Sequence, residues 1–247
     1  MIGLFDSGSG GLSVLTALRK RVPKADVAYF GDIAHAPYGI RSPEELIEFS
    51  RTGVEILKDM EAEEIVSACN SVSQSVLAGA AGDIPIIEMT SPTAKYMRSY
   101  AGKRVLLIAT PATVHAGIYE KALADVCALD SLSIPELAGA IEFGASEAEI
   151  QKIIHDAFQS RRSTQYDRIL LGCTHYPLVR DLIESEAAVF GSVEIIDPAE
   201  AVAEEVVQRF NAEGRGTTRF LISKDSEMFR SRVNELFSPS SYTIDVV

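Results

Sequence analysis

Short apolar runs alternate with amphipathic stretches along the whole chain, and this alternation predicts a repeated strand–helix order. In the stretch that follows the first run, Leu12, Leu15 and Leu18 fall on one face of a helix. A βαβα order favours parallel sheets that are covered by helices on both faces. The expected strands are Met1–Phe5, Val27–Phe30, Glu64–Ala68, Ile84–Ile87, Arg104–Ala109, Arg168–Gly172, Val193–Ile196 and Arg219–Ile222.

The starts of two helices carry capping sequences. Ser42-Pro43-Glu44-Glu45 and Ser146-Glu147-Ala148-Glu149 each place a glutamate three residues after a serine, which is the capping-box pattern. The run Arg19-Lys20-Arg21 closes the first predicted helix, where cations interact favourably with the helix dipole.

The length of 247 residues fits one large domain or two of ordinary size. Two segments allow the chain to cross between lobes, one around Pro92 and one around Pro198. We therefore expect a first lobe of residues 1–92 plus 204–247, which carries Cys69, and a second lobe of residues 93–203, which carries Cys173.

Charge and hydropathy exclude some classes of protein. A net charge of −12 argues against nucleic acid as a partner, because a phosphate-binding surface needs clustered lysine and arginine. No apolar run approaches the roughly 20 residues of a membrane span. The N-terminus leads directly into a strand and does not resemble a signal peptide. We expect a cytoplasmic protein that binds neither nucleic acid nor membrane.

Two of the three cysteines stand in matching places. Cys69 and Cys173 each follow an apolar run and precede an expected helix, whose positive N-terminus would favour a thiolate. Either cysteine alone could be a small buried hydrophobe. The matching contexts instead suggest a functional pair. Cys127 lies in a helical pattern, Ala122–Ala128, and is expected in the core.

A glycine-rich segment, Asp6-Ser7-Gly8-Ser9-Gly10-Gly11, follows the first strand. Its backbone amides could face an anion at the start of the next helix. It is not a dinucleotide fingerprint, since Ser13 stands where the third glycine would be, and it lacks the lysine of a phosphate-binding loop. A tight turn with Asp6 or Ser7 as the helix cap is the alternative.

Hydrogen-bond donors flank both cysteines. Asn70, Ser71, Thr174 and His175, together with Ser7, could hold the carboxylates of an anionic amino acid. Asp6 could orient an amine or assist a base, whereas His175 could alternatively be a capping or core histidine. All follow strand ends, where open α/β sheets bind ligands.

Five segments, in order, resemble the signature segments of the glutamate racemase family. They are Phe5-Asp6-Ser7-Gly8, Pro37-Tyr38-Gly39, Ala68-Cys69-Asn70-Ser71, Thr110-Pro111-Ala112-Thr113-Val114 and Gly172-Cys173-Thr174-His175-Tyr176-Pro177-Leu178. Related aspartate racemases generally carry glutamate at the place of His175, which favours glutamate as substrate. Ser71 stands where the family usually has threonine, and Ala138-Gly139-Ala140 is smaller than the usual stretch.

The resemblance implies two similar α/β lobes related by pseudo-two-fold symmetry, with the active site in the cleft between them. It implies that Cys173 takes the proton from L-glutamate and Cys69 from D-glutamate, with Asp6 and His175 as acid–base assistants and Glu142 in support. The resemblance implies no cofactor. It also implies a homodimer and a role in supplying D-glutamate for peptidoglycan. The implied substrate-binding residues are Asp6, Ser7, Pro37, Tyr38, Gly39, Asn70, Ser71, Thr113, Thr174 and His175.

Chemistry favours the same pair, because inverting a carbon centre needs a base on one face and an acid on the other. An ordinary thiol is only about 10% ionised at pH 7.5, so one cysteine must be activated while the other stays protonated.

Alternatives are another member of the superfamily, such as an aspartate or hydantoin racemase, a maleate isomerase or a malonate decarboxylase, and a catalytically silent binding protein. Because Met1 lies five residues before Asp6, we also expect no activator-binding N-terminal extension and constitutive activity.

Overall fold

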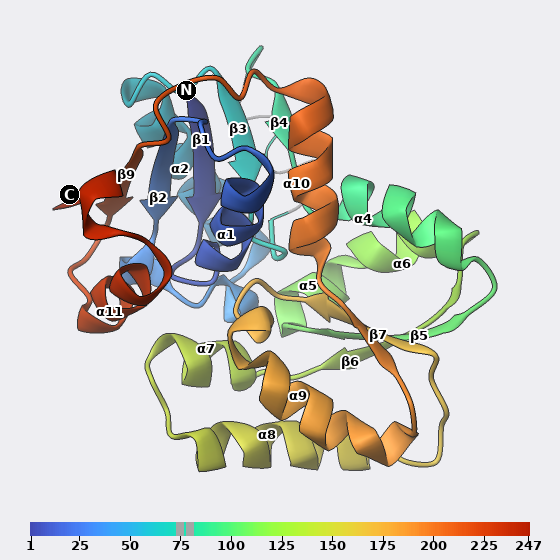
Figure 1. Cartoon of the computed structure of the whole chain (residues 1–247). Helices are drawn as coiled ribbons and strands as arrows, with labels where there is room; N and C mark the ends of the chain where they lie inside the picture. The colour runs from blue at the N-terminus through green and yellow to red at the C-terminus, as the bar shows by residue number, and fades with distance from the viewer. Residues whose placement is uncertain (73–76, 78–81) are drawn as a thin grey trace.

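The computed structural model describes residues 1–72, 77 and 82–247, and its strands form two parallel sheets (Figure 1). Neighbouring strands pair in parallel throughout both sheets. The first sheet contains, in spatial order, β10 (Tyr242–Val246), β9 (Thr218–Ile222), β2 (Val27–Gly31), β1 (Ile2–Asp6), β3 (Glu64–Ser67) and β4 (Ile86–Ile87). The second contains β6 (Ala128–Ser133), β5 (Arg104–Ala109), β7 (Arg168–Gly172) and β8 (Glu194–Ile196).

The two sheets repeat one strand order. The order β2-β1-β3-β4 in the first sheet matches β6-β5-β7-β8 in the second. In this correspondence β1 is equivalent to β5 and β3 to β7, so each sheet has a topological switch point beside its first strand. The expected α/β fold of two similar parallel sheets is confirmed.

Every strand that the apolar pattern predicts is present, with ends that differ by at most two residues, at the start of β4. The pattern missed β6 and β10, which both lie at sheet edges and carry polar or exposed residues instead of an apolar run. The helical pattern expected around Cys127 is wrong. The preceding helix, α6 (Ile118–Leu123), ends earlier, and Cys127 is half-buried just before β6, against the apolar side chains of the second sheet.

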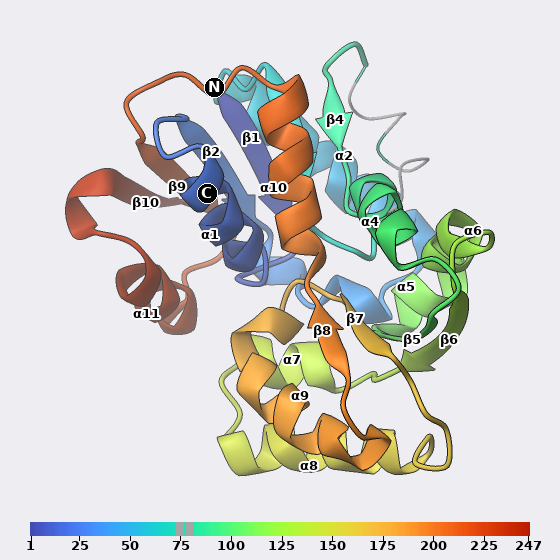
Figure 2. The same ribbon diagram turned by 45° about the vertical axis from the view of Figure 1, so that its right-hand side comes forward.

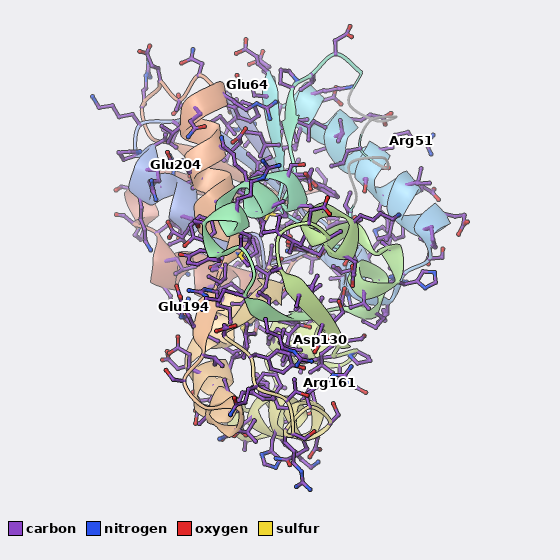
Figure 3. The ribbon with its side chains drawn as sticks, turned by 90° about the vertical axis from the view of Figure 1, so that its right-hand side faces the viewer. Arg51, Glu64, Asp130, Arg161, Glu194 and Glu204 are labelled. Carbon is purple, nitrogen blue, oxygen red and sulfur yellow. The ribbon has the colours of Figure 1, made fainter. Side chains whose placement is uncertain are left out.

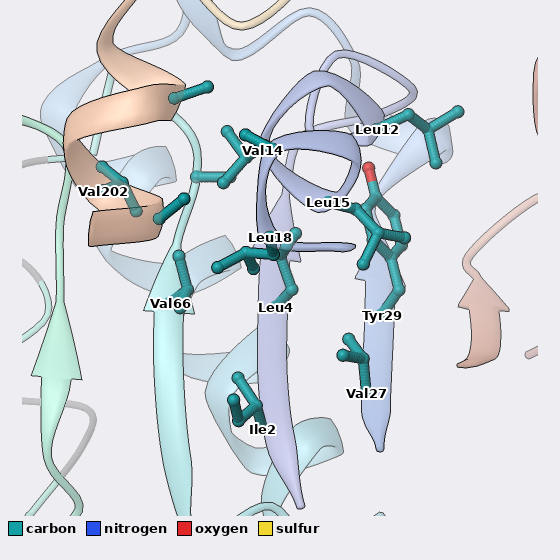
Figure 4. Packing of buried hydrophobic residues seen from close by; sticks show 14 of the residues in the cluster. Ile2, Leu4, Leu12, Val14, Leu15, Leu18, Val27, Tyr29, Val66 and Val202 are labelled. Carbon is teal, nitrogen blue, oxygen red and sulfur yellow. The ribbon is translucent and has the colours of Figure 1, made fainter. Parts of the chain in front are cut away.

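Helices cover both faces of each sheet, as the alternation of patterns predicts. One face of the first sheet packs on α1 (Leu12–Arg21), α10 (Pro198–Arg209) and α11 (Glu227–Leu236), as Figure 4 shows for α1, and the other packs on α2 (Pro43–Asp59). The second sheet packs on α7 (Leu137–Glu142), α8 (Glu147–Gln159) and α9 (Arg180–Ala187), and on its other face on α4 (Thr90–Met97) and α6. The short α5 (Pro111–Ala116) follows β5.

Helix ends follow the capping signals. The Ser42 hydroxyl accepts from the Glu45 N–H at 3.2 Å, and the Glu45 carboxylate accepts from the Ser42 N–H at 2.9 Å, which completes the expected capping box of α2. At α8 the Ser146 hydroxyl accepts from the Glu149 N–H at 3.3 Å. The basic run after Leu18 lies in the last turn of α1, as predicted.

The chain returns from the second sheet to the first at the start of α10. Asp197 caps this helix by accepting from the Ala199 N–H at 2.9 Å. Buried side chains from the beginning of α10 onward, including Ala199 and Val202, pack in the core of the first sheet. Figure 2 shows α10 alongside β1 above the strands of the second sheet.

Charged side chains such as Arg51, Glu194 and Glu204 lie on the outside of the molecule (Figure 3). Among the described residues, no helix has both the length and the apolar character that a membrane span would require.

Candidate functional site

Four loops at the carboxyl ends of equivalent strands come together between the sheets. They follow β1, β3, β5 and β7, which are the strands next to the two switch points. The polar side chains of these segments are almost fully buried. The segments are residues 6–11, 69–71 and 173–175, and residues 110–113 at the start of α5. The local sequence thus places both cysteines and the predicted donors in one region.

His175 lies between Cys173 and Glu142. Its Nδ1 is 3.7 Å from Cys173 Sγ, and its Nε2 is 2.6 Å from Glu142 Oε2. Glu142 ends α7 and also accepts from Ser9, at 3.1 Å from the N–H and 2.5 Å from the hydroxyl. Because Ser9 follows β1, these bonds join the two lobes.

The pKa shifts of His175 and Glu142 favour an ion pair between these two side chains. Burial lowers the pKa of His175, but hydrogen bonds to Cys173 and Glu142 outweigh it and raise that pKa to about 10. Burial likewise raises the pKa of Glu142, yet the hydrogen bond and the charge of His175 leave it lower than usual. At neutral pH, His175 is an imidazolium that donates from both nitrogens, toward the carboxylate and toward the sulfur of Cys173.

Asp6 ends β1 and interacts electrostatically both with Cys69 and with His175. Its carboxylate accepts from the Gly8 N–H at 2.9 Å and from the Thr174 hydroxyl at 3.1 Å. Burial raises the pKa of Asp6, and it also raises the pKa of the Cys69 thiol, to which the Asp6 charge adds. Hydrogen bonds from the Ser71 N–H and the Ser7 hydroxyl offset only part of this rise.

The expected stabilisation of a thiolate at Cys69 is therefore wrong, because burial and a neighbouring carboxylate outweigh the donors. The helix expected after Cys69 falls where residues 73–76 and 78–81 lie outside the described part of the chain. After Cys173, the chain forms a short 3₁₀ turn, Tyr176–Val179, before α9 begins.

Three hydroxyl groups form a compact triangle beside Cys69. Ser71 Oγ lies 3.1 Å from Thr110 Oγ1 and 3.3 Å from Thr113 Oγ1, and the two threonine oxygens are 3.0 Å apart. Ser71 belongs to the first lobe and the threonines to the second. Each hydroxyl carries one proton, which it can donate either to a neighbouring hydroxyl or to an anion, so a carboxylate could bind here in place of the bonds within the triangle.

Glycines allow the loops of the two lobes to approach closely. A Cβ on Gly10 would lie 2.5 Å from Thr174 Oγ1, and one on Gly39 would lie 2.4 Å from Thr110 Cβ. Pro37, Tyr38 and Gly39 follow β2, and the Tyr38 hydroxyl donates to the buried Asp32 at 2.7 Å. This segment therefore meets the second lobe at Thr110.

Asn70 is held by a tyrosine of the other lobe. The Tyr119 hydroxyl, on α6, donates to Asn70 Oδ1 at 2.5 Å, and both side chains are buried. Asn70 Nδ2 has no hydrogen-bond partner among the described residues. The bond from Tyr119 fixes which end of the amide is available to a ligand.

Sequence reasoning did not single out Ser9, Thr110, Tyr119 or Arg232, all of which contact the predicted site residues. Thr110 could have been found by strand equivalence, since it follows β5 as Ser7 follows β1. Ser9 belongs to the glycine-rich loop. Tyr119 and Arg232 carry no local signal, because each is an ordinary helical residue brought in by the tertiary fold.

We expect Tyr119→Phe to lower the free energy of unfolding by about 1–3 kcal/mol, because it leaves a buried amide oxygen without its donor. Tyr96→Phe is the matched control, since its hydroxyl bonds another tyrosine at an exposed site and should change stability by about 0.5 kcal/mol or less. Urea denaturation measures both values. Equal effects of the two substitutions would contradict a structural role for the Tyr119 bond.

The site offers two thiols, a buried imidazolium, two carboxyl groups and several hydroxyl donors. Within the ranges that the structure describes, no three histidine, cysteine, aspartate or glutamate side chains come together in an arrangement that could hold a metal ion. These thiols, the imidazole and the carboxyl groups could transfer protons, and the hydroxyl groups could donate hydrogen bonds to an anion.

The chain is similar to known racemases in sequence and in fold. The family model for Asp/Glu/hydantoin racemases matches residues 11–206. A glutamate racemase of Aquifex aeolicus is 34% identical over 230 residues, which cover 92% of this chain and 89% of the relative. The structure of a glutamate racemase isoform from Bacillus anthracis superposes with a TM-score of 0.87 at 29% identity and covers 100% of this chain and 97% of its own. A Francisella tularensis glutamate racemase, solved in complex with D-glutamate, gives a TM-score of 0.84 at 27% identity, with coverage of 100% and 96%.

Proposed function

Because the chain belongs to the Asp/Glu/hydantoin racemase family, we propose that it interconverts L- and D-glutamate by proton transfer at two cysteines, without a cofactor. The observation that carries the proposal is the contrast between the two thiols. Cys173 faces an imidazolium, whereas burial and Asp6 raise the pKa of Cys69. The raised pKa suits Cys69 to the role of acid, and the neighbouring imidazolium suits Cys173 to the role of base.

In the proposed reaction the Cys173 thiolate removes the α-proton of L-glutamate. The C–H bond breaks, its electron pair stays on the α-carbon and spreads into the carboxylate, and an S–H bond forms at Cys173. The Cys69 thiol then donates its proton to the opposite face, which leaves D-glutamate and a Cys69 thiolate. The reverse reaction exchanges the two roles.

The surrounding charges support this division of labour. The imidazole of His175 lies 3.7 Å from Cys173 Sγ, where it can donate to the sulfur during proton transfer, and Glu142 keeps His175 protonated. Asp6 disfavours a thiolate at Cys69, so that this residue holds its proton until a carbanion forms. The raised pKa of Asp6 makes this carboxyl group a better proton acceptor when the Cys69 thiolate has to form in the reverse direction.

Donors around the cysteines would bind the substrate's two carboxylates. One anionic group could bind at the hydroxyl triangle of Ser71, Thr110 and Thr113 and at Asn70 Nδ2, which has no hydrogen-bond partner within the described ranges. Ser7 and Thr174 lie beside the two thiols, and Asp6 can accept from the substrate ammonium group. Preorganised donors of this kind stabilise the charge that develops during proton removal.

Glutamate is preferred to aspartate because of His175 and because the relatives reported above are glutamate racemases. The supply of D-glutamate for peptidoglycan, the cytoplasmic location and the homodimer stay predictions from the sequence. The division into residues 1–92 plus 204–247 and residues 93–203 is likewise a proposal. The packing of Ala199 favours a second boundary slightly earlier, near Pro198.

An assay with amino-acid enantiomers in deuterium oxide tests the proposal. We expect L-glutamate to yield D-glutamate that already carries deuterium at the α-carbon, because the Cys69 proton exchanges with solvent. Chiral chromatography with mass detection measures both products, with L-aspartate as the control substrate. Faster turnover of aspartate would contradict the proposal that glutamate is the substrate. Unlabelled D-glutamate would contradict proton transfer by exchangeable thiols. Inactivity with every amino acid would favour a catalytically silent binding protein.

A further inference from the structure

Arg232, on α11, carries its guanidinium group into the contact between the two lobes. The side chain is only 14% exposed. Its Nη1 donates to the Ser9 hydroxyl, its Nη2 donates to the carbonyl of Ile141, and Nη1 lies 3.7 Å from Glu142 Oε2. The C-terminal helix therefore contacts the loop after β1 and the end of α7 through one cation.

The Ser9 hydroxyl links this cation to Glu142. It accepts from Arg232 and donates to Glu142 Oε2 at 2.5 Å, an arrangement in which the positive charge strengthens the bond to the carboxylate. Burying a guanidinium group is unfavourable unless charged or polar groups compensate it. Arg232 contacts Ser9, Glu142 and the carbonyl of Ile141. The groups that compensate its burial therefore include Glu142, which also bonds His175.

The effect of Arg232 falls on one side of the site. Glu142 bonds His175, and His175 faces Cys173. Burial, the charge of Asp6 and that of Cys173 raise the pKa of Cys69, hydrogen bonds from Ser71 and Ser7 lower it in part, and neither Glu142 nor His175 is among these causes. A change at Arg232 therefore reaches the thiol of the second lobe before it reaches that of the first.

We propose that Arg232 is a positioning residue for racemisation, which holds Glu142 ionised and against His175 and so supports proton transfer at Cys173 and not at Cys69. This inference rests on the proposed function. Arg232 touches none of the reacting atoms and acts through Ser9 and Glu142. Through this residue, α11 contributes to the environment of Cys173 although the two are far apart in sequence.

Isotope effects with α-deuterated L- and D-glutamate test the proposal, because the two enantiomers lose their α-proton to different cysteines. We expect Arg232→Gln to lower kcat/KM about ten-fold, equally in both directions because the enantiomers have equal free energy. Slower transfer at Cys173 makes cleavage of the L-glutamate C–H bond more rate-limiting. The isotope effect should therefore rise with L-glutamate and fall with D-glutamate. Arg232→Lys should recover part of the rate.

The matched control is Arg230→Gln, on the same helix, where the arginine forms an exposed pair with Asp225 and should leave both isotope effects unchanged. If the glutamine variant does not fold, the lysine variant carries the same comparison. Unchanged turnover, or isotope effects that shift alike in both directions, would overturn the proposal. A wild-type enzyme that does not racemise glutamate would instead refute the proposed function.

Discussion

Cys69→Ala and Cys173→Ala are each expected to lower the rate of glutamate racemisation by about a thousand-fold or more, the largest effects predicted for this chain. A general acid or base contributes about 10²- to 10⁴-fold, and no other described thiol is positioned to replace either one, since Cys127 is half-buried beside the second sheet. Both variants should keep the fold, because alanine removes a single buried sulfur atom. Chiral chromatography and thermal melting measure the two properties.

Proton exchange separates the roles of the two cysteines. In deuterium oxide, Cys69→Ala still contains Cys173 and should exchange the α-proton of L-glutamate without racemising it. Cys173→Ala should do the same with D-glutamate only. Cys127→Ala is the matched control and should retain full racemisation. Near-normal turnover by either site variant, or exchange of the wrong enantiomer, would contradict the assignment of one cysteine to each face.

The fold could be predicted from the sequence wherever burial imposes a continuous apolar run. β1, β5 and β7 are buried almost throughout, and their limits agree with the apolar pattern to within one residue. The edge strands β6 and β10 were not predicted, because each pairs on one side only and carries polar or exposed residues in place of an apolar run, whereas the edge strands β4 and β8 were predicted from their apolar residues. The prediction of a helix through Cys127 was wrong because the residues after it begin the edge strand β6, which has no apolar run to mark it.

The site could be predicted where function depends on residues near strand ends. Cys69, Cys173 and Asp6 lie at or just after the ends of β3, β7 and β1, and parallel topology brings those ends together. The electrostatic setting could not be predicted in this way. Whether Cys69 favours a thiolate depends on its burial and on Asp6, which is 63 residues away in sequence (69 minus 6). Contacts made by Tyr119 and Arg232 likewise depend on how whole helices pack.

The ion pair of Glu142 and His175 should contribute both to activity and to a stability that depends on pH. The raised pKa of His175 stabilises the fold below its ordinary value of 6.5, and this contribution is lost as the pH rises toward 10. The lowered pKa of Glu142 stabilises the fold above its ordinary value of 4.5, and this contribution is lost as the pH falls. Both contributions to stability are therefore fully present between the two ordinary pKa values, 4.5 for glutamate and 6.5 for histidine.

Glu142→Gln should lower the rate of racemisation by about a hundred-fold, because His175 loses the carboxylate that keeps it protonated beside Cys173. It should also cost about 3 kcal/mol of folding free energy near pH 6, and this cost should shrink toward pH 10, where wild-type His175 itself loses its proton. Urea denaturation across this range, with the exposed Glu136→Gln as the control, measures the difference. A cost that stays constant with pH would mean that Glu142 contributes only packing and neutral hydrogen bonds, and the activation of Cys173 would then have to come from elsewhere.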